Sequence, residues 1–301
     1  SINMGSGSNE SEGGSEGNDQ SGTSDEKTKA KCPKGFKLLE HNNDHPHFRE
    51  IIPILMEVKS RDWKPNEFVG FFSPRFFEKT GCDFNDIEKS YQKYQNNKDV
   101  ILFSSFLGAT YYWLNPWEQG EWHNPGVGKI SNIIARELGT IDNLTSVAVP
   151  VDKFVFSHFL IATKPFWDKW AELTEAYLEM CAKNKTLAEF TTDYKGSKLS
   201  VHPFIVERFP SLLLLEQNLS AIQDEGQIHR WMQLGSITKT LVRMNMCKKN
   251  FQQIDGEQFK NEYWRLRIVN SLNPGDCFTE TAQRYLSNKT IFANHTTILV
   301  S

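Results

Sequence analysis

This chain contains two short runs in which almost every residue is apolar, "EFVGFFS" (67–73) and "DVILFSSF" (99–106). Strands of this kind are buried on both faces, as in sheets that helices cover on either side. Between them lies "DFNDIEKSYQKYQNN", a polar amphipathic stretch in which Asp83 is a suitable N-cap for a helix. A strand, a helix and a second strand in this order predict an α/β fold with a mostly parallel sheet flanked by helices.

The rest of the chain adds further expected elements. A helix broken at Pro53 is predicted within "HPHFREIIPILMEV", and another over "VGKISNIIAREL". The segment "KFVFSHFLIAT" reads as a strand with Ser157 and His158 in its middle. A long helix should follow over "KPFWDKWAELTEAYLEMCAKN", with Pro165 in its first turn. Beyond it the chain is expected to be mostly helical and to end in the β-prone "HTTILVS".

Composition divides the chain into two parts. Residues 1–31 are rich in Ser, Gly, Glu and Asn and nearly lack apolar side chains, which predicts a disordered linker or tag; a linker would join this chain to another module. Residues 32–301 are expected to form one domain, with a sheet part at about 36–165 and a mainly helical part at about 166–301.

Charge and hydropathy exclude several classes of partner. A net charge of −3 and a pI near 6.3 give no overall basic field for nucleic acid, and no apolar run is long enough to span a bilayer. The five cysteines are scattered without a C-x-x-C pair, which favours reduced thiols and a cytoplasmic location. The signatures of dinucleotide-binding, P-loop, zinc-protease and α/β-hydrolase sites are absent from the sequence.

Polar side chains follow the first apolar run, in "FFSPRFFEKTG". Ligands of open α/β sheets bind beyond the carboxyl ends of the strands. Ser73, Arg75 and Lys79 are therefore candidates for binding a diphosphate, the Arg as a planar fork and the Lys as a point charge. The alternative is a solvated helix start, with Arg75 and Lys79 on its exposed side.

A second group of candidates lies in "NPWEQGEWHNPG" (115–126), which has almost no hydrophobic period. Aromatic rings stack on sugars, while carboxylates and amides bind hydroxyl groups or act as bases. We expect a loop at the edge of a carbohydrate or nucleotide site, with Glu121 as a candidate catalytic carboxylate. The expected substrate-binding side chains are those of Trp117, Glu118, Gln119 and His123. A surface loop anchored by Trp is the competing interpretation.

Two further places put polar groups inside apolar segments. His158 interrupts an apolar strand, where a hydrogen-bonded core histidine is the commoner outcome and a substrate contact the alternative. Glu207 and Arg208 interrupt "HPFIVERFPSLLLL", and adjacent buried charges need either a partner or a function. Glu207 is therefore a second catalytic candidate, with Arg208 as a substrate contact, unless the two form a structural ion pair.

The segments quoted above occur in an order that resembles bacterial-type polysaccharide glycosyltransferase domains of the O-antigen and capsule type, with a GT-A-like (Rossmann-like) fold. The resemblance runs from "HNNDHPHFREIIPI" to "HPFIVERFPSLLLL", over about residues 40–220. It implies transfer of a sugar from a nucleotide-sugar donor to a glycan acceptor. Arg75 and Lys79 would contact the donor diphosphate, and Glu207 would deprotonate the acceptor hydroxyl or stabilise an oxocarbenium-like transition state.

Two features depart from that family. GT-A enzymes commonly hold Mn²⁺ or Mg²⁺ on an Asp-x-Asp motif, and this sequence has none. Either Arg and Lys bind the leaving diphosphate without a metal, or single carboxylates such as Asp44 or Asp142 are recruited. The family also opens with a strand, which here is either shortened to "FKLLE" or missing.

Two other functions stay open on the sequence. One is a carbohydrate-binding or scaffold module without catalysis, belonging to a larger glycan-assembly protein. The other is a hydrolase in which Glu121 and Glu207 act as a carboxylate pair across one cleft.

Overall fold

A six-stranded sheet forms the centre of the computed structural model, which describes residues 2–5, 36–39, 45–73, 75–194, 196–235 and 237–271. Its strands lie in the order β2-β1-β3-β5-β4-β8. They are β1 (Ile2–Gly5), β2 (Lys37–Leu39), β3 (Phe68–Phe72), β4 (Val100–Leu102), β5 (Leu160–Thr163) and β8 (Ala221–Gln223).

The sheet is mixed, because five of its strands run in one direction, as a mostly parallel sheet requires, and β5 runs against them. The strands β3 and β4 point the same way, as the strand-helix-strand pattern predicts, but they are not neighbours. The strand β5 lies between them and runs antiparallel to both, while β8 extends the sheet parallel to β4. Hydrophobic periodicity shows where a strand lies but not the direction in which it runs. The sequence pattern therefore could not predict that β5 is antiparallel to its neighbours.

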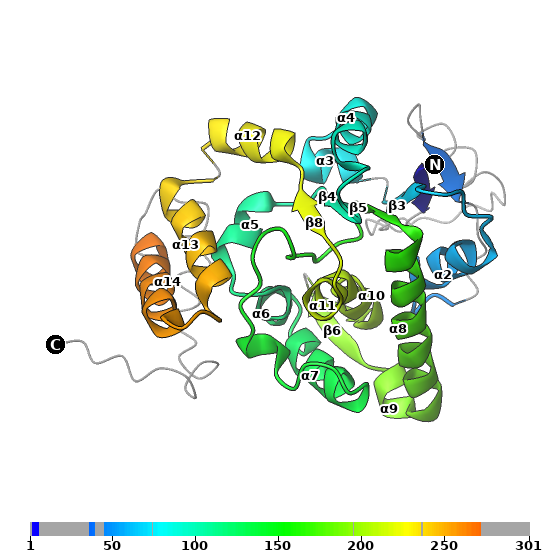
Figure 1. Ribbon diagram of the computed structural model, residues 1–301. Coiled ribbons are helices and arrows are strands. Elements are labelled where there is room, and N and C mark those ends of the chain that lie inside the picture. The colour runs from blue at the N-terminus through cyan, green and yellow to red at the C-terminus, as the bar shows by residue number, and fades with distance from the viewer. Residues whose placement is uncertain are drawn as a thin grey trace, which may run out of the picture.

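Helices cover both faces of the sheet (Figure 1). The helices before α10 are α2 (Ile51–Ser60), α3 (Phe76–Thr80), α4 (Phe84–Tyr94), α5 (Leu107–Tyr112), α6 (Pro116–His123), α7 (Val127–Glu137), η1 (Leu144–Ser146), α8 (Lys164–Lys183) and α9 (Lys185–Ala188). A hairpin of β6 (Thr191–Tyr194) and β7 (Ser197–Ser200) follows. The remaining helices are α10 (His202–Val206), α11 (Phe209–Glu216), α12 (Glu225–Gln233), α13 (Lys239–Asn250) and α14 (Gly256–Ser271).

Alternation along the strands divides the core into two layers. One layer packs Phe68 and Phe72 of β3 and Ile101 of β4 against α3 and α4. Val69 and Phe71 point the other way and pack against α2, α8, α10 and α11. Both faces are therefore buried, which explains why β3 and β4 carry no polar residues.

A second core lies beside the sheet. The helices α5, α6, α13 and α14 bury apolar side chains against one another, among them Tyr112, Trp117, Met244 and Tyr263. This cluster contains no strand residue. The helices of the later part of the chain bury their apolar faces in it. None of the helices in the described part of the chain is both long and apolar enough to cross a membrane.

Several predicted elements are confirmed. The two apolar runs form β3 and β4, and α7 and α8 occupy the expected segments. Asp83 caps α4 through a capping box, in which its side chain accepts from the Asp86 N–H and Asp86 accepts from the Asp83 N–H. The strand β2 falls within "FKLLE".

Three local predictions are wrong. Pro53 does not break a helix, because α2 begins at Ile51 and an N–H in the first turn has no helical partner to lose. Ser157 and His158 precede β5 instead of interrupting it. Glu207 and Arg208 lie between α10 and α11 rather than inside one helix.

The strand β1 falls within the segment expected to be a linker. Ile2–Gly5 pairs in parallel with β2 on one side and with β3 on the other. The remaining residues of 1–31, together with "HTTILVS", lie outside the described residues. The later part of the chain also supplies three strands, β6, β7 and β8, that the sequence did not indicate.

Gly70 in β3 tests the close contact between β3 and β5. A Cβ at this position would lie 2.4 Å from the Leu160 carbonyl oxygen and 2.7 Å from Ile161 Cγ2. We expect Gly70→Ala to lower the free energy of unfolding by at least about 2 kcal/mol in urea titration, because the antiparallel pair must separate. Gly196→Ala, in an open turn at φ +82°, should cost only about 1 kcal/mol of backbone strain. Equal losses would contradict the β3–β5 packing.

Candidate functional site

Five strands of the sheet, β1, β2, β3, β4 and β8, end at one edge. The strands β3, β4 and β8 point toward this edge, and β5 begins there because it runs the opposite way. The segments that follow β3 and β4, the segment that precedes β5, and the junction of α10 and α11 supply its side chains. We call this the carboxyl edge, and its charged members are Lys79 and Glu207.

Lys79 comes from α3, directly after β3. Its ammonium Nζ lies 5.9 Å from the centre of the Phe159 ring, which precedes β5. Its backbone carbonyl accepts a long hydrogen bond of 3.5 Å from the N–H of Phe106, which follows β4. Lys79 thus joins three segments that are far apart in the sequence, and no ion pair holds its ammonium among the described residues.

Glu207 provides the carboxylate of the edge. Protein surrounds its carboxyl group on most sides, although part of the residue still meets solvent. Burial raises the pKa of Glu207 to about 7, and the negative charge of Glu50 adds to that rise. The positive charges of Arg208, Lys79 and Arg49 oppose it. A carboxyl group of this pKa exchanges its proton near neutral pH.

A buried amide network fixes the geometry of the carboxyl edge. The Gln227 side chain donates to the Thr80 carbonyl at 3.1 Å and to the Ser104 carbonyl at 2.9 Å. Gln223 donates to Gln227 at 2.6 Å and to the Leu102 carbonyl at 3.0 Å. These bonds tie α12 to the ends of α3 and β4. They therefore fix the backbone segments that carry Lys79 and Phe106.

Two residues near this edge adopt a left-handed backbone. Arg49 and Phe106 both have φ +46°, which is uncommon for residues other than glycine. Such strain costs about 1–3 kcal/mol and persists only where the surrounding structure enforces it. Arg49 acts on Glu207 through its charge, and Phe106 contacts Lys79 through its backbone.

The other candidates that flank the strands have different surroundings. Arg75 is exposed and donates to Glu78 at 3.0 and 2.8 Å, so its guanidinium already has a carboxylate partner. Ser73 is partly buried, and its carbonyl accepts from the Phe76 N–H. His158 is buried, and burial lowers its pKa to about 4 while a ring nitrogen bonds the Val206 backbone. This environment matches a core histidine.

The segment 115–126 is mostly a helix and not the predicted loop. Asn115 caps α6 by accepting from the Glu118 N–H at 2.7 Å, and Pro116 occupies the first turn. Trp117 is 2% exposed within the second core, so its ring offers no face to a sugar. Hydrophobic period is missing because α6 is surrounded by protein on most sides, and its polar side chains are matched by buried cations.

Arg267 of α14 is one of these cations. Its Nη1 donates to the two Glu118 carboxylate oxygens at 2.8 and 3.1 Å, and both side chains are almost fully buried. The guanidinium lies about 5 Å from the ring centres of Tyr112, Trp113 and Trp264. Glu118 is therefore committed to joining α6 to α14.

Arg208 is the second cation that contacts α6. It is 2% exposed and donates to the Pro116 carbonyl at 2.7 Å and to Gln119 Oε1 at 2.7 Å. A Cβ on Gly120 would lie 2.7 Å from Arg208 Nε, so the glycine makes room for the guanidinium. Neither the sugar-site role predicted for Gln119 nor the substrate role of Arg208 fits these buried contacts.

Glu121 binds the start of the next helix. Its carboxylate accepts from the backbone N–H groups of Gly126 at 3.0 Å, Gly128 at 2.9 Å and Lys129 at 3.3 Å. Glu121 therefore stabilises the N-terminus of α7, while Glu207 faces Arg49, Glu50 and Lys79. His123 is exposed at the end of α6, 6.3 Å from the Trp113 ring centre.

The described residues do not fit a dedicated metal site. No group of three or more His, Cys, Asp or Glu side chains comes together among them. Asp142 is exposed between α7 and η1, and Asp44 lies outside the described residues. We derive no step through a metal.

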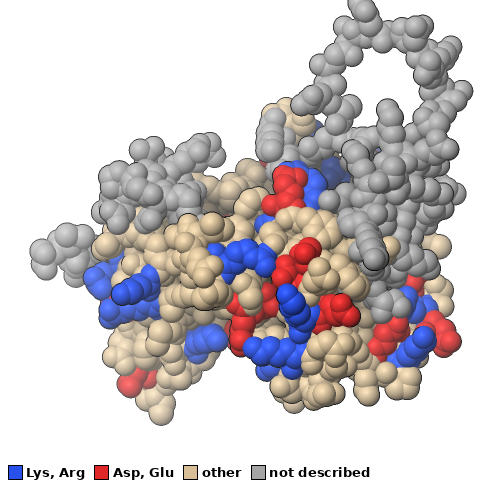
Figure 2. All heavy atoms as spheres, turned by 90° about the horizontal axis from the view of Figure 1, so that it is seen from above, with Lys and Arg blue, Asp and Glu red and all other residues tan. Residues whose placement is uncertain are grey.

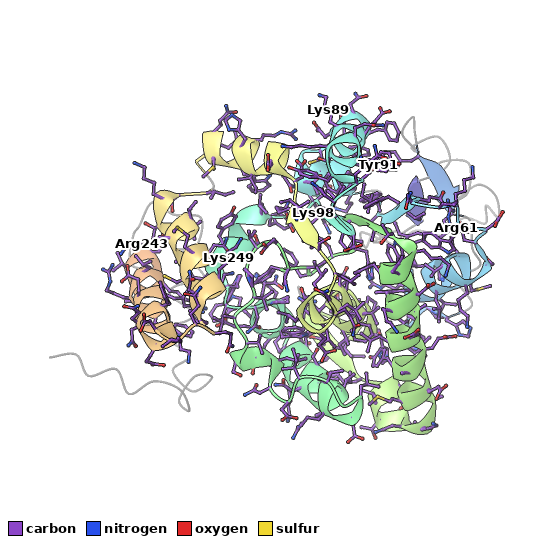
Figure 3. All side chains as sticks on the ribbon, viewed as in Figure 1. Arg61, Lys89, Tyr91, Lys98, Arg243 and Lys249 are labelled. Atoms are coloured by element: carbon purple, nitrogen blue, oxygen red, sulfur yellow. The ribbon has the colours of Figure 1, made fainter. Side chains whose placement is uncertain are left out.

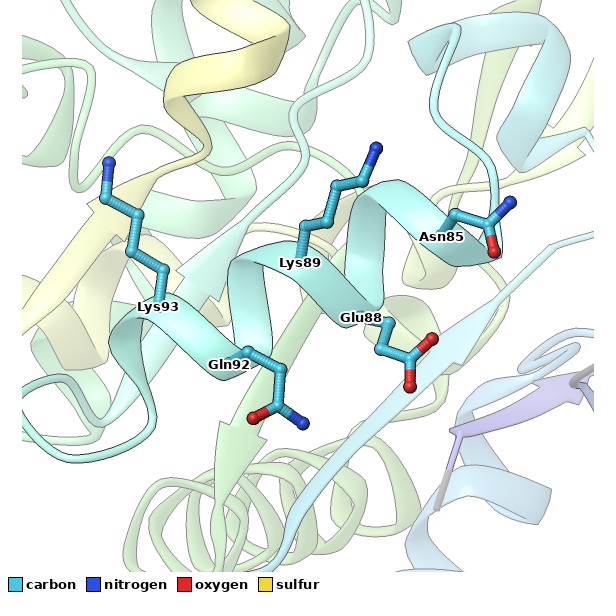
Figure 4. Close-up of a pocket in the computed structure, with 5 residues that line it drawn as sticks. All are labelled: Asn85, Glu88, Lys89, Gln92 and Lys93. Atoms are coloured by element: carbon cyan, nitrogen blue, oxygen red, sulfur yellow. The ribbon is translucent and has the colours of Figure 1, made fainter.

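Charges elsewhere are dispersed. On the face shown in Figure 2, basic and acidic side chains are intermixed. Arg61, Lys89 and Arg243 lie far apart in Figure 3, and Arg61 and Arg243 pair with carboxylates. A shallow depression on α4 is lined by Asn85, Glu88, Lys89, Gln92 and Lys93 (Figure 4), all from one helix. It receives no residue from the carboxyl edge.

The sequence did not single out several residues of this edge. Phe106 and Phe159 looked like ordinary core residues of apolar runs, and Arg49 and Glu50 like the start of a helix. The position of the two Phe residues at the ends of strands was the available signal. No signal linked residues 49 and 50 to Glu207, because their electrostatic interaction depends on how the segment before α2 lies against α10, where Phe48 contacts His202.

No protein-family model, curated protein or solved structure matches this chain.

The buried pair of Glu118 and Arg267 gives a stability prediction. Arg267→Met should lower the free energy of unfolding by about 3–5 kcal/mol, because it leaves a buried carboxylate without its cation. The double variant Glu118→Gln/Arg267→Met should be more stable than Arg267→Met alone, because it no longer buries the unpaired Glu118 carboxylate. Urea titration of the two single variants and the double variant measures the coupling. Losses that simply add would show that the pair does not interact.

Glu207 gives a pH-dependent stability prediction. Because its folded pKa lies above the ordinary value of 4.5, the folded protein binds this proton more tightly than the unfolded chain. The resulting stability is complete below about pH 4.5 and is lost as the pH rises through about 7. Glu207→Gln should therefore gain about 1–3 kcal/mol over the wild type between about pH 5 and pH 8 in urea titration. A difference independent of pH would contradict the raised pKa.

Proposed function

We propose that this chain is a glycosyltransferase that transfers a sugar from a nucleotide-sugar donor to a glycan acceptor, with the carboxyl edge as its active site and a GT-A-like relationship for its α/β fold. One observation carries the proposal. Glu207, a partly buried carboxyl group with a pKa near 7, interacts electrostatically with the cation Lys79 at the edge where β3, β4 and β8 end. Open α/β sheets bind their ligands at such edges.

Glu207 has the properties of a general base. A base works best when its pKa is near the operating pH, because it is then ionised and still holds a proton firmly. In the proposed reaction the Glu207 carboxylate takes the proton of the acceptor hydroxyl as that oxygen attacks the anomeric carbon. The bond from that carbon to the diphosphate breaks, and the electron pair leaves with the diphosphate.

Lys79 is suited to the departing diphosphate. Its ammonium has no carboxylate partner among the ion pairs of the described residues, so a bound anion would not have to displace one. The neighbouring Phe159 ring shields it from water on one side. Arg49 brings a second positive charge toward the same edge. No support comes from Arg75, whose guanidinium binds Glu78.

A cytoplasmic location belongs to the same proposal. Nucleotide sugars are the implied donors, and the described cysteines Cys82, Cys181 and Cys247 are free and buried, as expected of reduced thiols. A hydrolase mechanism gains nothing from the structure, since Glu121 is bound to the start of α7.

The decisive assay measures release of nucleoside diphosphate from a panel of nucleotide sugars, with and without oligosaccharide acceptors and Mn²⁺. Glu207→Gln should lower kcat about 10²–10⁴-fold while leaving donor affinity nearly unchanged, because it removes only the base. Release that is equally fast in Glu207→Gln would remove Glu207 from the mechanism. Binding of oligosaccharides without any nucleotide binding would favour the non-catalytic carbohydrate-binding module.

Lys79→Ala tests the diphosphate contact separately. Loss of one charge-assisted contact should weaken nucleoside diphosphate binding about tenfold in isothermal titration calorimetry. Arg75→Ala is the matched control, since Arg75 flanks the same short helix but is exposed and bound to Glu78. If the two variants bind equally, Lys79 does not hold the diphosphate.

A further inference from the structure

Phe106 is the most exposed aromatic side chain at the carboxyl edge. Its relative exposure is 55%, whereas Phe103 and Phe159 beside it are buried. Single exposed apolar side chains are ordinary on protein surfaces. Phe106, however, also has a left-handed backbone, with φ +46° and ψ +55°, which is unfavourable for a bulky aromatic residue. Two unfavourable features therefore coincide at one position.

The neighbours of Phe106 force its ring outward. Ser105 and Leu107 on either side are buried, at 3% and 0% exposure. Ser105 Oγ lies 3.4 Å from Ser157 Oγ of the segment before β5, and the Phe106 carbonyl accepts from the Ala109 N–H at 2.8 Å. With both neighbours held inward, a left-handed residue between them must present its side chain to solvent. The fold thus keeps an exposed ring at this position.

The backbone of Phe106 lies next to that of Lys79, the cation of the site. The Phe106 N–H contacts the Lys79 carbonyl, and Lys79 acts on Glu207 through its charge. We infer that Phe106 is a stacking platform for a ring of the ligand whose anionic group Lys79 binds. This inference rests on the proposed function and adds to it the residue, Phe106, that contacts a ring of the phosphate-bearing ligand.

Two ligand rings have the required chemistry. A nucleobase presents a planar π-face to an aromatic side chain, and a pyranose presents an apolar face of C–H groups. Both are attached to phosphate in a nucleotide sugar. Phe supplies the stacking face without a polar group, so the contact favours ring shape rather than one hydrogen-bonding pattern.

Isothermal titration calorimetry on the full chain tests the platform with three kinds of anion. The probes are inorganic pyrophosphate, the nucleoside diphosphates UDP, GDP, ADP and CDP, and glucose 1-phosphate. Phe106→Gly removes the ring, and glycine keeps the left-handed backbone without strain. We expect it to weaken binding of a ring-bearing anion about tenfold and to leave pyrophosphate unchanged. Phe106→Tyr should bind like the wild type, because it keeps the ring.

Phe190→Ala is the matched control, since Phe190 is a partly exposed Phe between α9 and β6, away from the carboxyl edge. It should change no binding constant. A loss confined to nucleoside diphosphates identifies the base as the stacked ring, and a loss with glucose 1-phosphate identifies the sugar. Both results support the platform.

Other results would overturn it. If wild type and Phe106→Gly bind the ring-bearing anions equally, Phe106 is not a stacking platform. The same conclusion follows if Phe106→Gly loses as much affinity for pyrophosphate as for the ring-bearing anions. Neither result contradicts the proposed function. A wild type that binds none of the probes would remove the platform and the proposed function together. Binding that depends on Phe106, in a protein that transfers no sugar in the release assay, would remove only the transferase function.

Discussion

The helix α6 is held between two buried guanidinium groups, and the arrangement of both cores depends on this contact. Arg208 donates to its backbone and to Gln119 from the sheet side, while Arg267 binds Glu118 from the helical side. Each cation is taken out of water, so each requires the partners it has. The sheet core and the helical core therefore meet along a polar helix. Their relative position is fixed by hydrogen bonds with defined directions, whereas apolar packing alone would permit sliding.

The same contact positions the candidate site. Arg208 is anchored in the core, and Glu207 precedes it in the sequence, so anchoring the guanidinium turns the preceding carboxylate toward the carboxyl edge. From the other direction, Gln227 fixes the ends of α3 and β4, which carry Lys79 and Phe106. A site built from four separate segments stays rigid because each segment ends in a buried polar contact. Rigid support of this kind is what preorganised chemistry requires.

The carboxyl edge also shows a conflict between stability and function. Glu207 has its pKa raised because it is largely surrounded by protein next to Glu50, and an ionised carboxylate there destabilises the fold above neutral pH. Phe106 adds a strained backbone and an exposed ring. Neither feature improves folding, and both lie within reach of Lys79. Features that reduce stability tend to gather where a protein binds or reacts, since packing alone would have removed them.

The sequence determined the local structure of this protein. Apolar runs predicted β3 and β4, the capping box at Asp83 set the start of α4, and polar residues in or after apolar segments drew attention to Glu207 and Lys79. Only the tertiary structure decided that β5 runs antiparallel between β3 and β4, and that 115–126 is a buried helix. In the sequence, a polar residue that pairs with a distant buried cation cannot be distinguished from one that is exposed to solvent or binds a sugar. The difference lies in partners about 90 and 150 residues away, Arg208 and Arg267, whose positions no local pattern encodes.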